Sequence, residues 1–165
     1  MSPSDLTGVT FRAAKEPDLP ILIEIGRKAF LFAFWELSPI EVIRDWVTSD
    51  FEGRQYPELL QEMRVASVDD RPVGVLGAKE DYVGGLWIHP HYHRRGIGTR
   101  LMRDAETMAR EHGHAKLWLE TSEYNAGAPA FYRAIGYREA GERIEILSTG
   151  IAERLTRFEK TLSVR

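Results

Sequence analysis

The stretch YVGGLWIHPHYHRRGIGTRLMRDAETMAREH, from Tyr82 to His112, sets the expectation for the whole fold. It begins as a short apolar segment, crosses a turn rich in histidine, and reaches a Gly-x-Gly at Gly96 and Gly98. Apolar residues then recur at helical spacing through Leu101 and Ala105. The pattern predicts a strand, a glycine turn and a helix, in that order.

The junction between the glycine turn and the helix is suited to binding a phosphate group. The first amides of a helix have no partner within it, the helix dipole adds positive charge there, and glycine permits close approach. Arg94 and Arg95 add two positive charges. A P-loop would need a lysine after its glycine, and a dinucleotide fingerprint would need a third glycine where this chain has Leu101. We therefore expect a pyrophosphate cradle of another class.

Residues 89–99, HPHYHRRGIGT, resemble the acetyl-CoA motif of the GNAT superfamily of N-acetyltransferases, written Gln/Arg-x-x-Gly-x-Gly/Ala. Gly96 and Gly98 match its glycines, whereas His93 stands where the superfamily has Gln or Arg. A second GNAT signature, in which Asn precedes a short helix with Phe-Tyr and then Gly-Phe/Tyr, resembles the run from Asn125 to Tyr137. The two signatures follow each other in the order that the superfamily requires.

The remaining hydrophobic pattern predicts the order β-α-α-β-β-β-α-β-α-β-β. Strands are expected at 9–13, 63–68, 73–78, 82–88, 116–120, from 137 onward, and 155–162; helices are expected at 18–30, from 38, at 97–112 and at 128–135. The resemblance implies a mixed α/β fold, with a mostly antiparallel seven-stranded sheet splayed between the fourth and fifth strands and about four flanking helices. We expect residues 1–165 to form one N-acetyltransferase domain.

Three local features refine these elements. Asp18 is expected to cap the first helix, and Ser38-Pro39-Ile40-Glu41 has the form of a capping box for the second. The second helix should turn Val42, Ile43, Trp46 and Val47 inward. Paired glycines weaken a strand, so Gly84-Gly85 predicts a bulge or the close approach of a ligand.

Composition excludes several classes of function. The chain of 165 residues has a net charge of −3 and a pI near 6.0, so no global positive field favours nucleic acid or an anionic membrane. It contains no cysteine, which excludes disulfides and thiolate catalysis. The N-terminus lacks the pattern of a signal peptide, and the longest apolar run, Ala29 to Trp35, is too short to span a bilayer. We expect a soluble cytoplasmic protein.

The resemblance implies that acetyl-CoA is the cosubstrate and that it lies in the split of the sheet. The resemblance assigns residues to three parts of acetyl-CoA. They are Trp87, Ile88, His89 and Asn125 for the pantetheine, His93, Arg94, Arg95, Gly96, Ile97, Gly98 and Thr99 for the pyrophosphate, and Tyr132 for the thioester sulfur. No metal ion is expected. His89, His91 and His93 alternate, but Pro90 interrupts the strand and no carboxylate or cysteine completes a metal site.

Acetyl transfer to an amine requires a proton donor for the departing thiolate and an acceptor for the proton of the amine. Tyr132 is the expected general acid; the alternative is an aromatic ring that only packs on the buried face of its helix. Several groups flank the predicted split and are candidate bases: Glu80, Asp81, His89, Glu120 and Glu123. Glu120 is the candidate we name, with ordered water as the alternative.

Phe30, Phe32, Phe34 and Trp35 place four aromatic rings in six residues. They are interpreted as core, as a dimer contact, or, for Phe32, Phe34 and Trp35, as the wall of an acceptor pocket shared with residues 144–153. The expected acceptor is a primary amine of a small molecule, an amino acid or a peptide N-terminus. Two alternatives remain open, a non-catalytic acyl-CoA-binding protein and a toxin-like acetyltransferase acting on aminoacyl-tRNA; negative charge disfavours the latter. A homodimer also remains open.

Overall fold

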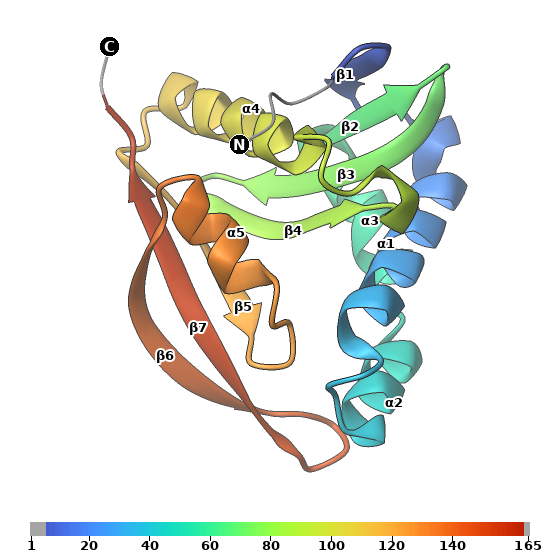
Figure 1. Cartoon of the computed structure of the whole chain (residues 1–165), viewed down its shortest axis with the longest axis vertical. Coiled ribbons are helices and arrows are strands. Elements are labelled where there is room, and N and C mark those ends of the chain that lie inside the picture. Colours follow the sequence, from blue (N-terminus) through green and yellow to red (C-terminus); the bar gives the residue numbers. More distant parts are fainter. Residues whose placement is uncertain (1–5, 164–165) are drawn as a thin grey trace.

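The computed structural model describes residues 6–163, in which seven strands form one mixed sheet. The strands are β1 (Val9–Ala13), β2 (Met63–Val68), β3 (Arg71–Lys79), β4 (Tyr82–Ile88), β5 (Lys116–Ser122), β6 (Arg138–Ile146) and β7 (Ala152–Thr161). Their spatial order is β1-β2-β3-β4-β5-β7-β6, and neighbours are antiparallel except for the parallel pair β4 and β5 (Figure 1). The predicted mixed seven-stranded sheet is confirmed.

The sheet splits between β4 and β5, as predicted. The two strands share one paired position, Tyr82 opposite Trp118, and beyond it β4 pairs only with β3. The edge of β4 that faces β5 is therefore free to receive another chain or a ligand. The predicted bulge is also present, because Gly85 pairs with Gly77 and Val83 pairs with Ala78, which leaves Gly84 as the extra residue.

Five α-helices accompany the sheet, whereas the sequence predicted about four. They are α1 (Leu19–Phe34), α2 (Ile40–Ser49), α3 (Phe51–Leu59), α4 (Ile97–Glu111) and α5 (Ala128–Ala134), with short 3-10 turns at Glu16–Asp18, Leu60–Glu62 and Pro90–Tyr92. None of the helices formed by residues 6–163 has the length and apolar content that a membrane span requires.

Period-two alternation in the strands places α1 and α3 on one face of the sheet and α4 on the other. Val65 of β2 packs in one cluster with Leu22 of α1, whereas the next residue, Ala66, packs in another with Leu101 of α4. Tyr56 of α3 joins the first cluster. Two hydrophobic layers thus hold the sheet between helices.

The predicted ends of the first two helices were wrong. Helix α1 continues to Phe34 instead of ending near Phe30, because the two rings lie four residues apart and both are buried on the same side. Asp18 does not cap α1; its carboxylate accepts hydrogen bonds from the Arg12 guanidinium and the Lys15 amide. Ser38 likewise caps nothing, since Pro39 occupies the N-cap of α2 without a side-chain hydrogen bond.

Within α2, the predicted inward face is partly correct. Val42 and Ile43 are buried, whereas Val47 is 58% exposed. Helix α3 was not predicted, for two reasons. Only Asp50, a residue in a left-handed conformation, separates it from the end of α2, and the helix itself contains Pro57. Both features are typical of turns when only the sequence is considered.

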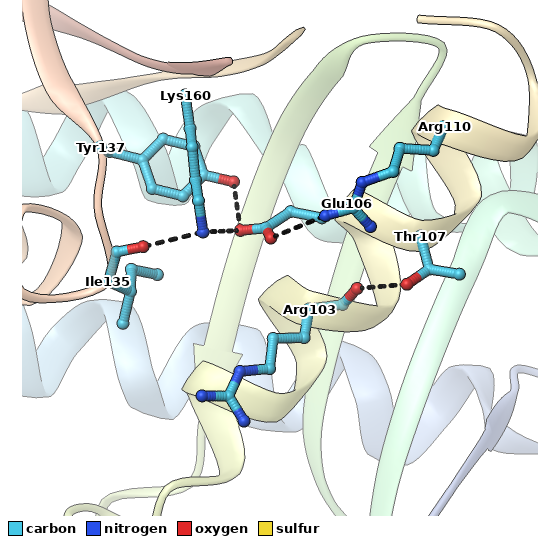
Figure 2. A network of polar contacts seen from close by, with 7 residues as sticks. All are labelled: Arg103, Glu106, Thr107, Arg110, Ile135, Tyr137 and Lys160. Carbon is cyan, nitrogen blue, oxygen red and sulfur yellow. Dashed lines mark hydrogen bonds and ion pairs between the residues drawn. The ribbon is translucent and has the colours of Figure 1, made fainter. Parts of the chain in front are cut away.

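A buried carboxylate on α4 ties the two halves of the split sheet together (Figure 2). Glu106 accepts a hydrogen bond of 2.8 Å from the ammonium of Lys160, on β7, and one of 3.2 Å from the Tyr137 hydroxyl. Lys160 also donates to the carbonyl of Ile135, at the end of α5, at 2.9 Å. Helix α4 packs on β2, β3 and β4 and also on β5, so it spans the split, and the contact with Lys160 extends this link to β7.

Candidate functional site

A cavity of about 330 Å³ lies in the split between β4 and β5, and we call it the split cavity. On the side of α5 its lining includes Asn125 and Tyr132, and Trp87 contributes from β4. The opposite end is formed by α1, α2, α3 and the β6–β7 hairpin, with Phe30, Phe34, Asp45, Trp46, Glu52, Leu147 and Glu153 in the lining. One cavity therefore connects residues assigned to the acetyl donor with residues in reach of an acceptor.

Along the open edge of β4, the backbone groups of only every second residue face the split. The His89 amide donates to the Val73 carbonyl at 2.8 Å, so it points into the sheet and away from the split. Backbone groups alternate in direction along a strand, so Trp87 shares this orientation and Ile88 faces the split. Of these three residues, all assigned to pantetheine, Ile88 turns its backbone toward the split, and Trp87 alone belongs to the lining of the cavity.

The glycine turn leaves a row of amides without partners. Arg94 and Gly96 adopt left-handed conformations, with φ of 61° and 84°, and α4 begins immediately afterwards at Ile97. Among residues 6–163, the amides from Arg94 to Thr99 donate to no other residue; the first to do so is that of Arg100, to the Gly96 carbonyl at 3.0 Å. Six unpaired donors at a helix start fit a pyrophosphate.

Close packing explains why position 98 is a glycine, which the motif alone did not reveal. A Cβ atom at this position would lie 3.3 Å from the Phe131 ring and 3.6 Å from the Leu86 side chain. The start of α4 thus sits tightly against α5 and β4. Gly96 differs, because its positive φ makes it the residue that needs glycine for the turn itself.

His93 does not simply replace the Gln or Arg of the motif. Its Nε2 lies 2.9 Å from the Ile88 carbonyl, to which it donates, and its ring meets Phe32 edge-on at 5.4 Å. The side chain is thereby turned toward the end of β4 and toward α1. Within the described part of the chain, no three His, Asp or Glu side chains are grouped so that they could hold a metal ion.

Tyr132 projects from α5 into the split cavity and is only 8% exposed. Its ring meets Phe131 and Tyr137 edge-on, at centroid distances of 5.0 and 5.8 Å. Burial raises the pKa of the Tyr132 hydroxyl well above its ordinary value, with a smaller contribution from Tyr82. The hydroxyl carries its proton at neutral pH, as an exposed tyrosine also would.

Of the five candidate bases, Glu120 alone lines the split cavity. Its two carboxylate oxygens accept hydrogen bonds of 2.7 and 2.9 Å from the guanidinium of Arg143, on β6. The positive charge of Arg143 compensates the negative charge of the Glu120 carboxylate, which would have to accept the proton of the amine. The other four candidates, Glu80, Asp81, His89 and Glu123, lie outside the lining.

Sequence reasoning missed two carboxylates of the cavity. Glu52 is 1% exposed, and burial raises its pKa from the ordinary 4.5 to about 7. Burial also raises the pKa of Glu153, which accepts a hydrogen bond from the Ser122 hydroxyl. Glu52 lies on α3, a helix that the sequence did not predict. Glu153 is the last residue of the segment 144–153, which was predicted only as part of the wall of an acceptor pocket.

The aromatic wall of the cavity differs from the predicted one. Phe34 lines it, but Phe32 and Trp35 are 64% and 63% exposed and lie outside the lining. Phe30 and Trp46 take their place, with rings stacked at 3.9 Å. Because α1 continues through this segment, neighbouring aromatic residues point to different sides of the helix.

Comparison with known proteins gives a consistent result. The family model described as "Acetyltransferase (GNAT) family" matches residues 22–137. A [ribosomal protein bS18]-alanine N-acetyltransferase of Escherichia coli K12 is 38% identical over 131 residues, covering 79% of this chain and 82% of that protein. A GCN5-related N-acetyltransferase from Rhodopseudomonas palustris superposes with a TM-score of 0.81 at 22% identity, over 93% of this chain and 95% of the other. The PaiA N-acetyltransferase of Thermoplasma acidophilum, solved with coenzyme A, gives 0.72 at 19% identity, over 93% and 98%.

Proposed function

The chain belongs to the acetyltransferase (GNAT) family, and we propose that it transfers an acetyl group from acetyl-CoA to a primary amine in the split cavity. The observation that carries this proposal is the position of Tyr132, a buried hydroxyl on the cavity wall beside the open edge of β4. The acceptor is the amine of a small molecule, an amino acid or a peptide N-terminus.

The donor is held by backbone more than by side chains. The unpaired amides from Arg94 to Thr99 bind the pyrophosphate, assisted by the dipole of the 15-residue helix α4. Arg95 packs its guanidinium over the Tyr92 ring at 5.1 Å, beside this turn. The backbone of Ile88 and the side chain of Asn125 align the pantetheine arm along β4.

Bound acetyl-CoA supplies the acetyl thioester, whose carbon forms a bond to the amine nitrogen as the carbon–sulfur bond breaks. The enzyme holds the two reactants together in the split cavity, which makes the reaction effectively unimolecular. Tyr132 donates its proton to the departing sulfur, so that CoA leaves as a thiol. The Tyr132 hydroxyl is protonated at neutral pH, so this proton is present at the start of each cycle.

The proton lost by the amine passes to a carboxylate of the cavity, directly or through water. Glu120 performs this role if Arg143 releases it, and Glu153, whose pKa burial raises, performs it otherwise. The variants Glu120→Gln and Glu153→Gln separate these cases, because only loss of the true base removes the lower limb from the pH profile of kcat/KM.

The direct test is to incubate the protein with acetyl-CoA and a panel of primary amines while following free thiol. An acetyltransferase releases thiol only with a suitable amine and forms the acetylated amine in equal amount. Specific binding of acetyl-CoA without thiol release from any amine would instead indicate a non-catalytic acyl-CoA-binding protein.

A further inference from the structure

The structure assigns a charge class to the acceptor. We propose that the end of the split cavity formed by Phe30, Asp45, Trp46, Glu52 and Glu153, the acceptor end, binds a small organic cation with at least two ammonium groups. One amine reacts near Tyr132 while another is held at the acceptor end. The inference rests on the proposed function and narrows its substrate class.

Four carboxylates line the cavity, and the lining contains no lysine, arginine or histidine among the described residues: the acids are Asp45, Glu52, Glu120 and Glu153. Arg143 compensates Glu120, but the hydrogen bonds to Asp45 and Glu153 come from neutral groups, the Ser148 amide and hydroxyl and the Ser122 hydroxyl. The cavity therefore has an excess of negative charge in a partly desolvated place, which favours a cation.

Glu52 gives an independent indication of a missing partner. The side chain is 1% exposed, and its Oε1 atom accepts no hydrogen bond within residues 6–163. Its own amide, the Trp46 side chain and the charge of Arg27 stabilise the charged form, but burial outweighs them and the charge of Asp50 opposes them. A buried carboxylate oxygen without a donor is costly, and an ammonium group brings three donors and the compensating charge.

The aromatic rings of the acceptor end suit the rest of such a ligand. Phe30 stacks on Trp46 at 3.9 Å and on Phe34 at 4.3 Å, and its edge meets Trp87 at 6.2 Å. The faces of the Phe30 ring are covered by Trp46 and Phe34, so the stacked rings form an apolar wall that can pack against methylene chains. Carboxylates and aromatic walls together select an alkyl chain with positive ends.

The tip of the β6–β7 hairpin favours a small molecule over a polypeptide end. Ser148 of this tip donates its amide to Asp45 of α2 at 2.7 Å, and Leu147 and Ile151 pack against the cluster that contains Phe34. Figure 1 shows the tip beside the end of the molecule that carries α2. The hairpin tip thus closes one side of the acceptor end and limits the space for a large acceptor.

The inference is tested by comparing kcat/KM for three amines of similar length with saturating acetyl-CoA at about pH 8, where the Glu52 carboxylate is ionised. We expect 1,4-diaminobutane to exceed n-pentylamine by about tenfold or more, because a desolvated charge pair contributes at least that much, and 4-aminobutyrate to fall below both. Equal values for the diamine and the monoamine would overturn the inference while leaving acetyl transfer established. So would a peptide with an N-terminal alanine that is acetylated faster than the diamine.

Glu52→Gln provides the matched variant, since it removes charge but keeps shape. The ratio of kcat/KM for 1,4-diaminobutane to that for n-pentylamine should fall about tenfold, and Glu52→Asp should restore part of it. Glu58→Gln, an exposed change on the same helix, should leave the ratio unaltered. An unchanged ratio in Glu52→Gln would assign Glu52 a purely structural role.

If no amine is acetylated, the proposed function fails, but the inference still has its own test. Calorimetry with 1,4-diaminobutane on the CoA-saturated protein should show binding that is lost with Glu52→Gln and kept with Glu58→Gln. Absence of binding to the wild-type protein would overturn the acceptor assignment.

Discussion

At the scale of single residues, the role of general acid that we propose for Tyr132 can be tested on its hydroxyl alone. Tyr132→Phe keeps the ring that meets Phe131 and Tyr137 and removes only the proton donor. We expect kcat to fall by about 10²- to 10⁴-fold, with little change in the KM for acetyl-CoA, because general acid help has this magnitude. Steady-state kinetics that follow free thiol provide the measurement. The loss in kcat should be smaller for acyl donors whose thiol is a better leaving group. If Tyr132→Phe has the kcat of wild type under conditions where chemistry limits the rate, Tyr132 is only a packing residue.

Glu52 makes a prediction about stability as well as about binding. Its folded pKa of about 7 lies above its ordinary 4.5, so the folded state holds a proton that the unfolded state releases first. The free energy of unfolding should therefore decrease as pH rises from about 4.5 through about 7, by up to about 3 kcal/mol. Glu52→Gln lacks this titration, so its stability relative to wild type should increase over that pH range.

Denaturant unfolding of both proteins at a series of pH values provides the check. Glu58→Gln serves as the control, since Glu58 is exposed on the same helix. Parallel pH profiles for wild type and Glu52→Gln would show that Glu52 titrates like an ordinary surface carboxylate.

At the scale of elements, the start of α4 should decide donor binding. Gly96 and Gly113 both have φ of +84°, at opposite ends of this helix, so the same substitution strains both turns alike. Gly96→Glu should abolish CoA binding, because it adds a side chain and a negative charge at the amide row. Gly113→Glu should lose comparable stability and still bind CoA in calorimetry. Similar CoA affinities for the two folded variants would contradict the cradle.

Elements with local signals could be predicted from the sequence, and elements defined by tertiary contacts could not. Strands such as Tyr82–Ile88 carry their own alternation, and the glycine motif located the start of α4. Helix α3 lacks such a signal, because its start is a left-handed Asp50 and its stability comes from packing under α1.

The same division holds within the site. Tyr132 and Asn125 belong to a local motif, and both reach the cavity. The engagement of Glu120 by Arg143 joins residues 23 positions apart, and Glu52 enters the cavity from a helix that the sequence did not reveal. The pair of Glu120 and Arg143 depends on the register of β6, which no local pattern of the sequence specifies.

At the scale of the whole molecule, a sheet that splits must be held together elsewhere. Figure 2 shows the buried Glu106 of α4 bridging to Lys160 and Tyr137 on the other side of the split. Glu106→Gln leaves the Lys160 ammonium without its counter-charge, and we expect a loss of about 1–3 kcal/mol in the free energy of unfolding. Glu111→Gln, an exposed change on the same helix, should cost little.

Denaturant unfolding measures both variants, and a double-mutant cycle with Lys160→Met isolates the bridge. The two changes should be strongly non-additive, because removing both charges leaves neither unpaired. Additive losses would show that the pair of Glu106 and Lys160 contributes little to holding the halves of the sheet together.

The central claim is that this molecule moves an acetyl group from acetyl-CoA to an amine inside the split of its sheet. Its most direct test measures free thiol and acetylated amine in parallel, for wild type and Tyr132→Phe, with acetyl-CoA and the preferred amine. We expect equal amounts of thiol and acetylated amine over many turnovers, and both should fall together in the variant. Thiol release no faster than in the absence of protein, from a chain that binds acetyl-CoA, would contradict it.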